Sequence, residues 1–360
     1  MMRTLPFYIS RHYLMAFLLI LSSLLGIVFI FDVIELLRRT AVKDVDIGVI
    51  FLMGVLHLPD IGQKILPFIA LFAAMLTLWR LTRSQELIVV RATGVSVWQF
   101  LTPMLVTTLA LGLFYLFTIN PLGALMKRAY GELENKYIDN SAILDLSSSG
   151  LWLRQKDGER RFLLHADTVS VNPFTIKPLI AFIYDKNDQY LGRIDANSAV
   201  LQDKQWIIPE GWMNWKDKPA QKIGQTAIPT NLSLHKIQES MAAPGSVSFW
   251  ELPHFISALE ATGFPGLTHR MMYHELIVQP FFLCAMVVCA ACFSLGMARR
   301  GTAFLSALAG LFAGSFAFGS NDMVLTLGTN QALPTWLAAT AVPLITASVA
   351  MAALFHLEDG

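Results

Sequence analysis

Charged side chains are scarce in this sequence. Of its 360 residues, 15% are Asp, Glu, Lys or Arg, whereas about 25% is usual for a soluble domain. Hydrophobic residues make up 54% of the chain, and the mean hydropathy is +0.52. The composition therefore excludes an ordinary soluble protein and indicates one that is embedded in a membrane. The net charge of +1 gives no reason to expect a nucleic-acid partner.

Cysteine is also scarce. Cys284, Cys289 and Cys292 lie together in one apolar run. This placement excludes a disulfide framework and a zinc site of the CxxC type. We expect all three to be packing residues, as is usual for buried free cysteine.

Motifs for catalysis are missing. No stretch reads GxxxxGK[ST], so the chain cannot hold nucleotide phosphates in a P-loop of its own. HRMMYHE (residues 269–275) lacks the spacing of an HExxH metal site, and SSSG (residues 147–150) lacks the GxSxG elbow of a serine nucleophile. We therefore expect no catalytic residue, no metal and no cofactor bound by this chain.

Long uncharged runs are abundant. A helix that crosses a hydrocarbon core of about 30 Å needs roughly 20 apolar residues. The second of the candidate spans is short, so we expect it to start near Ile61, with Lys64 snorkelling at its head. The third is expected to end at Asn120-Pro121, because the residue before proline disfavours helix. The predicted spans are residues 14–31, 61–79, 92–126, 276–298, 302–321 and 335–355.

Residues 127–269 have a different pattern, in which short alternating runs such as GLWLRQ, RRFLLHADTVSV and YLGRI are separated by turn signals such as KDGE and KNDQ. Strands at this spacing predict an antiparallel sandwich or roll. The predicted fold is a membrane protein with six transmembrane helices and one inserted antiparallel, jellyroll-like β domain. Spans one to three occupy residues 1–126, the β domain with its connections residues 127–269, and spans four to six residues 270–360.

Six spans place both termini on one side of the membrane and the β domain on the other. Basic residues near the span ends are equally numerous on the two sides, so the positive-inside rule does not decide the orientation. On the β-domain side the basic residues are mixed with acids such as Asp32 and Asp60, whereas the side of the termini has little acid besides Glu86 and the C-terminal tail. This weakly favours cytoplasmic termini.

The gap RLTRSQELIVVRATGVS (residues 80–96) carries three arginines and a glutamate between two apolar runs. A helix over about residues 82–95 places Arg83, Leu87 and Val90 on one face, with Glu86 beside them, and ends near Gly94. Two interpretations stay open. The gap is either a plain extension of the second span with topology-anchoring arginines, or an interfacial helix that docks onto another protein, as in an ABC permease.

The same residues carry a resemblance to a known family. RSQELIVVRATGVS resembles the helix after span two in the LptF/LptG family of lipopolysaccharide-export permeases, and Glu86, Leu87, Ala92 and Gly94 match the family pattern. FDVIELLRR, LPDIGQKILP and SSGLWLRQKDGERRF, together with the six-span layout, extend the resemblance over essentially the whole chain. GLWLRQKDG is more similar to the LptG branch than to the LptF branch.

The resemblance implies a transport permease that is not itself an enzyme. Members of the family pair as a heterodimer of two permeases on two copies of a cytoplasmic ABC ATPase, which uses ATP and magnesium. They extract lipopolysaccharide from the bacterial inner membrane and pass it through periplasmic β domains to a bridge of similar jellyroll folds. The resemblance further implies that Glu86 docks into the ATPase, with Arg83, Leu87 and Arg91 in the same contact.

The resemblance also implies basic contacts with lipid A phosphates at the outer ends of the spans. Arg38 and Arg39 match a basic pair of the family, and Arg128 matches a basic position after span three. Asp32 stands where some members have a lysine, so one expected contact is missing or displaced. The alternative is that Arg38 and Arg39 pair internally with Asp32 and Glu35.

Two other classes of function stay open on the residues alone. One is a related ABC exporter that moves another lipid or a lipoprotein. The other is a membrane enzyme that modifies lipid head groups. Such an enzyme needs a nucleophile or a metal cluster at the outer face, and the sequence shows no motif for either.

Overall fold

The computed structural model describes all residues except 1–3, 42–44, 88, 90–93, 95, 139–142, 148–149, 158–159, 172–173, 187–188, 203, 217, 231–244, 262–265, 299–302 and 360. The chain forms two compact units. The membrane unit consists of Met1–Tyr130, Gly245–Trp250 and Arg270–Gly360, and the β unit of Gly131–Pro244 and Glu251–His269. These limits differ from the predicted domains chiefly because Gly245–Trp250 belongs to the membrane unit.

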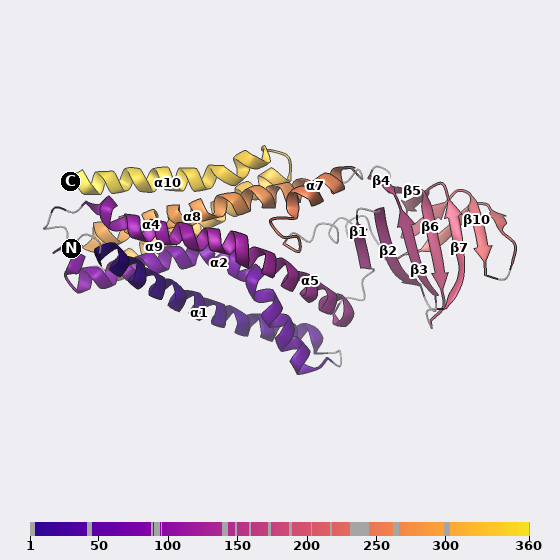
Figure 1. The fold of residues 1–360 in the computed structure, drawn as a ribbon, viewed down its shortest axis with the longest axis horizontal. Coiled ribbons are helices and arrows are strands. Elements are labelled where there is room, and N and C mark those ends of the chain that lie inside the picture. The colour runs from indigo at the N-terminus through magenta and orange to yellow at the C-terminus, as the bar shows by residue number, and fades with distance from the viewer. Residues whose placement is uncertain are drawn as a thin grey trace. The chain divides into compact units, whose positions relative to one another are not determined.

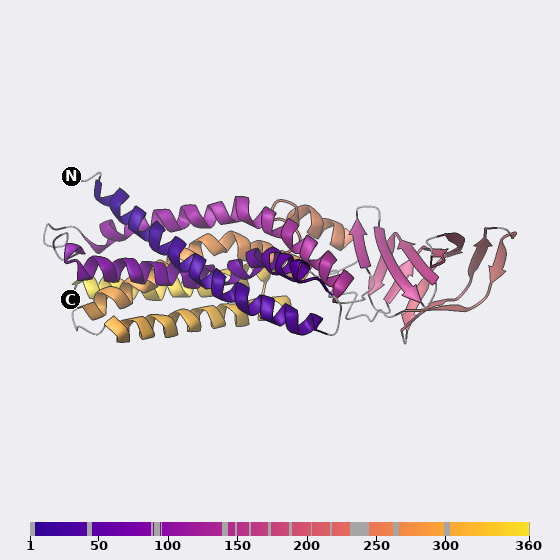
Figure 2. The same ribbon diagram turned by 90° about the horizontal axis from the view of Figure 1, so that it is seen from below.

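Long helices make up the membrane unit (Figures 1 and 2). They are α1 (Thr4–Thr40), α2 (Ile47–Arg83), α4 (Val97–Phe114), the π-helical turn η1 (Tyr115–Ile119), α5 (Asn120–Tyr137), α8 (Leu267–Ala298), α9 (Ala303–Thr329) and α10 (Thr335–Asp359). The start of α1 and the end of α10 lie at one end of the unit, which we call the terminal end. The opposite end, where α1 ends and α2 begins, we call the far end.

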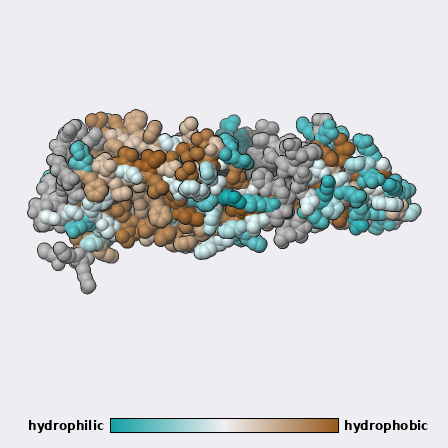
Figure 3. Space-filling model, turned by 90° about the horizontal axis from the view of Figure 1, so that it is seen from above, coloured by the Kyte–Doolittle hydropathy of each residue, from teal (hydrophilic) through white to brown (hydrophobic). Residues whose placement is uncertain are grey.

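Among the described residues, five helical segments are long and apolar enough to cross a membrane. They are Leu5–Thr40, Ile47–Arg83, Val97–Glu134, Leu267–Ser294 and Thr335–Leu357. The sixth predicted span corresponds to α9, a helix of 27 residues that includes side chains outside the described part of the chain. Hydrophobic side chains cover much of the visible surface of the helices (Figure 3). The chain is thus a multi-pass membrane protein, as predicted.

Two helices extend further than the sequence predicted. α2 begins at Ile47 instead of near Ile61, because the polar side chains in its first half are paired with other helices, as described below. The third span continues through Pro121 into α5. A π-helical turn precedes this proline, and the Asn120 N–H donates to the Tyr115 carbonyl in the wider i to i+5 pattern. The helix is therefore already widened where the proline ring enters it.

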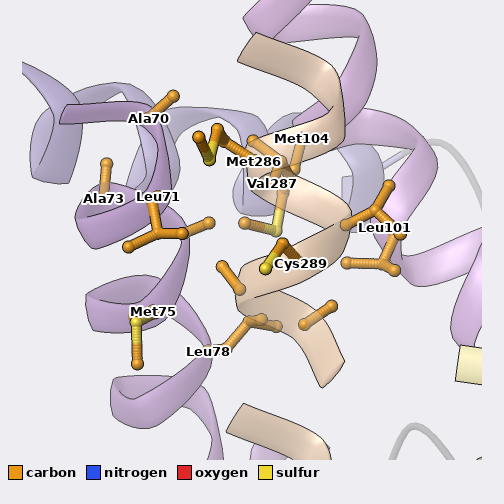
Figure 4. Close-up of a cluster of buried hydrophobic side chains, with 14 of the residues drawn as sticks. Ala70, Leu71, Ala73, Met75, Leu78, Leu101, Met104, Met286, Val287 and Cys289 are labelled. Carbon is orange, nitrogen blue, oxygen red and sulfur yellow. The ribbon is translucent and has the colours of Figure 1, made fainter. Parts of the chain in front are cut away.

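The core of the membrane unit lies where α2, α4 and α8 meet (Figure 4). Small residues of α2 such as Ala70 and Ala73 are fully buried, which lets the helices approach closely. Cys289 is 8% exposed in the same cluster and Cys292 packs against it, which confirms the predicted packing role for these two of the three free cysteines. The larger side chains of the cluster include Leu71, Leu78, Leu101, Met104, Met286 and Val287.

Two antiparallel sheets form the β unit. The seven-stranded sheet has the order β1-β2-β3-β6-β7-β10-β11, and the five-stranded sheet the order β12-β9-β8-β5-β4. The strands are β1 (Ile143–Ser147), β2 (Gly150–Asp157), β3 (Arg160–Ala166), β4 (Thr168–Val171), β5 (Phe174–Lys177), β6 (Leu179–Tyr184), β7 (Tyr190–Ala196), β8 (Ala199–Gln202), β9 (Gln205–Ile208), β10 (Gly211–Trp215), β11 (Gln221–Ile223) and β12 (Thr226–Pro229). The short helix α7 (Leu252–Ala261) belongs to the same unit.

Side-chain alternation builds the core of the β unit. Leu153, Leu164, Ala181 and Ile194 are register partners across four neighbouring strands, and all are buried. Trp206 of the five-stranded sheet is fully buried in the same cluster. The period-two pattern of the sequence therefore predicted both the inward rows and an inserted antiparallel β fold, which the structure confirms.

Candidate functional sites at the two ends of the membrane unit

A break in the helix separates the predicted docking residues at the terminal end. α2 ends at Arg83, and the next residues form a turn in which the Gln85 N–H donates to the Thr82 carbonyl. Gln85 has a φ of 66°, a left-handed conformation that interrupts a right-handed helix. Arg83 therefore belongs to the end of α2, where its guanidinium lies 5.3 Å from the Trp79 ring centroid. The predicted single helix over residues 82–95 is divided at this point.

Glu86 resumes the helix after this turn and is partly exposed. The Tyr8 hydroxyl of α1 lies within hydrogen-bonding reach of its carboxylate. Leu87 is only 5% exposed and belongs to the core of the membrane unit. It therefore points into the unit, whereas the sequence predicted that it lies on the docking face. The neighbouring Val89 is 62% exposed. The segment thus carries a carboxylate at the surface that is anchored by a buried leucine.

The end of this segment is partly described. Arg91, the fourth residue predicted to contact the ATPase, lies outside the described residues. Gly94 has a φ of +85°, which suits the helix end predicted there. Ser96 then caps α4, because its hydroxyl accepts a hydrogen bond from the Gln99 N–H at 3.3 Å.

The predicted phosphate-binding arginines lie at the far end, and their side chains are exposed. Arg38 donates to both carboxylate oxygens of Glu35, with distances of 2.8 Å from Nε and 2.7 Å from Nη2. Arg128 donates from Nε to the Ser246 carbonyl at 2.6 Å. Arg39, the second residue of the basic pair, occupies the last turn of α1. Internal pairing, the alternative that the sequence left open, therefore holds for Arg38 and Glu35.

A second polar group at the far end was not predicted. His57 of α2 lies between two carboxylates, with Nδ1 3.0 Å from Oδ1 of Asp32 and Nε2 3.8 Å from Oδ2 of Asp60. Lys127 of α5 donates to Oδ1 of Asp60 at 2.6 Å. The His57 ring stacks on Tyr130 with a centroid distance of 4.8 Å. We call Asp32, His57, Asp60 and Lys127 the charge network; it joins the far ends of α1, α2 and α5.

The charge network explains the position of Asp32. This residue pairs with His57 and not with the arginines of its own helix, so it is a structural partner within the protein where some family members have a lysine. The four side chains of the network are 16–26% exposed, which is well buried for charged groups. The sequence holds only a general signal for the network, because the acids Asp32 and Asp60 alternate with basic residues on this side of the membrane but their partners are not evident.

Neutral polar side chains extend this region into the membrane unit. The Tyr115 hydroxyl of η1 donates to Oε1 of Gln63 on α2 at 3.0 Å. The Gln63 carbonyl lacks its usual helical donor because the residue four positions later is Pro67. Nε2 of Gln279 on α8 donates to this carbonyl at 3.1 Å instead. A backbone group that proline leaves free inside the membrane is thus satisfied by another helix.

The fold and these sites define a class. A bundle of spanning helices with an inserted β fold and polar groups at both ends is typical of a transport permease. The chain belongs to the LptF/LptG family, because the family model described as "Lipopolysaccharide export system permease LptF/LptG" matches residues 7–356. It is a lipopolysaccharide export permease, which confirms the predicted resemblance.

An individual relative agrees with this assignment. The chain is 23% identical over 332 residues to "Lipopolysaccharide export system permease protein LptG" of Haemophilus influenzae, and the match covers 90% of each protein. The coverage extends over the helices and the inserted β fold alike. The similarity therefore concerns the whole architecture and not one domain.

Proposed function

We propose that this chain is the LptG-type subunit of a two-permease complex that extracts lipopolysaccharide from the bacterial inner membrane. The observation that carries the proposal is the family match along residues 7–356. The partners are a second permease of the same family, a cytoplasmic ABC ATPase dimer that hydrolyses ATP with magnesium, and a periplasmic bridge of jellyroll folds. This chain binds no cofactor itself, its termini are cytoplasmic, and its β unit is periplasmic.

In this proposal the ATPase acts on the membrane unit through Glu86. The carboxylate is partly exposed, whereas the next side chain, Leu87, is held in the core. A force on the carboxylate would therefore reach the helix bundle through one peptide unit. A carboxylate pairs well with a guanidinium in a partly desolvated groove, which is the geometry that such a contact requires. Arg83 and Arg91 supply the basic surroundings of the contact.

Substitution of Glu86 tests the coupling contact. Truncation of one partner of a desolvated charge pair costs about 2–5 kcal/mol, so Glu86→Ala should weaken binding of the ATPase about thirtyfold or more. Glu86→Gln separates the charge from the size of the side chain. Val89→Ala, an exposed neighbour, is the matched control and should leave binding unchanged. Co-purification of the ATPase and its stimulation by lipopolysaccharide are the measurements, and an unaffected Glu86→Ala complex would refute the contact.

We further propose that Arg38, Arg39 and Arg128 bind the phosphates of lipid A. The Arg38–Glu35 pair supports this, because both side chains are exposed and an exposed ion pair is weak enough to exchange for a phosphate. Two observations favour the same surface: the arginines lie at the far end, and much of α1 is uncovered, with 11% of its apolar window buried. A lipid could therefore approach them from the side.

Photocrosslinking tests the arginine contacts. A photoreactive residue at position 38 or 39 should capture lipopolysaccharide in cells. The same probe at Ile27, an exposed position nearer the middle of α1, is a control for contact with ordinary lipid chains. If positions 38 and 39 yielded no adduct beside a working positive control, these residues would not be phosphate ligands.

A further inference from the structure

A short segment returns to the membrane unit from within the region that the sequence assigned to the β domain. Gly245–Trp250 is flanked on both sides by residues of the β unit, yet it packs with the helices. The Arg128 side chain donates to the Ser246 carbonyl at 2.6 Å, and the Phe249 N–H donates to Oδ1 of the buried Asn120 at 2.9 Å. The segment is thus held to α5 by two hydrogen bonds to its backbone.

The first residue of the segment also fits closely. Gly245 has a φ of +93°, a backbone conformation that residues other than glycine rarely adopt. A Cβ atom there would lie 2.9 Å from Nζ of Lys127 and 3.2 Å from Oδ1 of Asp60. The segment therefore enters the membrane unit directly against the charge network.

Two aromatic rings end the segment. Phe249 stacks on Tyr273 of α8, with a centroid distance of 5.4 Å and an interplanar angle of 11°. Trp250 stacks on Phe117 of η1 at 5.3 Å and 24°. Phe117 is 44% exposed and Trp250 is 62% exposed, so the pair forms part of the outer surface of the helices.

The depth of this pair follows from helix geometry. Phe117 comes roughly 20 residues after Val97, a rise of about 30 Å along the helix, which equals the thickness of the hydrocarbon core. A span that enters the hydrocarbon core at Val97 would leave it near the level of Phe117. Phe117 belongs to the apolar span Val97–Glu134, and its ring is 44% exposed on the surface of that span. Trp250 shares this level, because its ring stacks on Phe117.

Other exposed tryptophans lie near the ends of spans. Trp336 is 59% exposed in the first turn of α10. From Trp336, α10 runs roughly 20 residues, or about 30 Å, toward the terminal end. Near that end, Trp79 of α2 is 43% exposed. Exposed tryptophans at both ends of the spans are typical of the two interfaces of a bilayer.

We propose that Phe249 and Trp250 form a membrane anchor, in which the indole of Trp250 inserts among lipids at the head-group boundary at the far end. The anchor binds the bilayer and not a second protein. Tryptophan suits this level because its ring is apolar and its N–H can reach the wet head groups. The anchor fixes to the membrane the stretch of chain between the strands of the β unit and α7. The inference does not depend on the transported substrate.

Fluorescence quenching tests the anchor in the full chain reconstituted into nanodiscs. The signal of Trp250 is the difference between the unmodified chain and Trp250→Phe, a variant that keeps an aromatic ring against Phe117. Lipids brominated near the top of their acyl chains should quench most of this difference, and aqueous iodide should quench little of it. Trp212→Phe is the matched control, because Trp212 is 51% exposed on β10 of the β unit and its signal should respond to iodide and not to bromolipid.

Two results would overturn the anchor. If iodide quenched the Trp250 signal as strongly as that of Trp212, while bromolipid did not, the segment would be a solvated loop. If neither agent quenched it, protein and not lipid would cover the ring. Circular dichroism of Trp250→Phe, expected to be unchanged, verifies that the difference signal comes from one residue in an intact fold.

Discussion

His57 has a fixed place between two helices at the far end. Nδ1 of its ring is hydrogen-bonded to Oδ1 of Asp32 on α1, and Nε2 faces Asp60 of its own helix. Oδ2 of Asp32 is buried and has no hydrogen-bond partner among the described residues. Removal of His57 would therefore leave a carboxylate with no partner in an apolar setting, which costs more than the pair itself contributes.

A double-mutant cycle measures this dependence. His57→Phe keeps the ring stacked on Tyr130 but removes its nitrogen atoms, and Asp32→Leu replaces the carboxylate with an apolar group of similar size. Each single change should lower the thermal unfolding midpoint in detergent. The double variant should recover part of the loss, with a coupling of about 0.5–3 kcal/mol. Strictly additive effects would show that the two side chains do not depend on each other.

The sequence identified some of these residues better than others. Glu86, Arg38 and Arg128 were selected because each lies close to a span end and matches a position of the family pattern, and their roles stay predictions. Leu87 was placed on the docking face because a regular helix was assumed, and the left-handed φ of Gln85 breaks that regularity. The charge network was missed because partners on three helices, far apart in sequence, cannot be paired without the fold.

At the scale of elements, close packing of α4 on α8 depends on one small residue. Gly112 of α4 faces Pro280 of α8, and a Cβ atom at position 112 would lie 2.8 Å from the Pro280 Cα. A backbone atom cannot rotate away as the end of a side chain can. The two helices would therefore have to separate to accept any larger residue.

Alanine substitution at two glycines tests this contact. Gly112→Ala should destabilise the membrane unit by about 1–3 kcal/mol through overpacking. Gly26→Ala is the matched control, because Gly26 is also helical and a Cβ atom there meets nothing within 4 Å. Both variants gain up to about 1 kcal/mol in helix propensity, so the difference between their thermal midpoints isolates the packing. Equal midpoints would contradict the close α4–α8 contact.

Strands in which hydrophobic residues alternate regularly were predicted well, and elements without a regular hydrophobic spacing were not. The runs RRFLLHA and YLGRI became β3 and β7, because alternation at period two fixes which residues face the core. The starts and ends of the helices were predicted poorly. The sequence located the spans as uncharged runs, and such a run stops at a charged residue. The start of α2 was therefore missed, because its first half contains Asp60, which pairs with Lys127. The π-helical turn before Pro121 has no sequence signal that we could identify.

At the scale of the whole molecule, the number of crossings decides which faces of the membrane the termini occupy. Five segments of the described chain qualify as spans, and α9 adds a sixth if it crosses as predicted. Its 27 residues rise about 40 Å, which is enough to cross the bilayer. The terminal end of the membrane unit holds both the start of α1 and the end of α10, as an even number of crossings requires.

Protease accessibility tests this topology in sealed membrane vesicles. Tags fused to the two termini should be cleaved from the same side, the cytoplasmic one. A tag inserted beside Lys204, an exposed turn residue between β8 and β9, should be cleaved only from the other side. Termini on opposite sides would mean that α9 does not cross the membrane.

The backbone connections between the two units decide which helices receive a force that acts on the β unit. The polypeptide crosses from one unit to the other within α5, at each end of Gly245–Trp250, and near the start of α8. A pull on the β unit is therefore transmitted through the backbone to α5, α8 and the aromatic segment. α1, α2 and α10 have no such backbone tether to the β unit. Tension on the β unit therefore enters the membrane unit through α5, α8 and the aromatic segment, and it reaches α1 and α2 only through side-chain contacts such as the charge network.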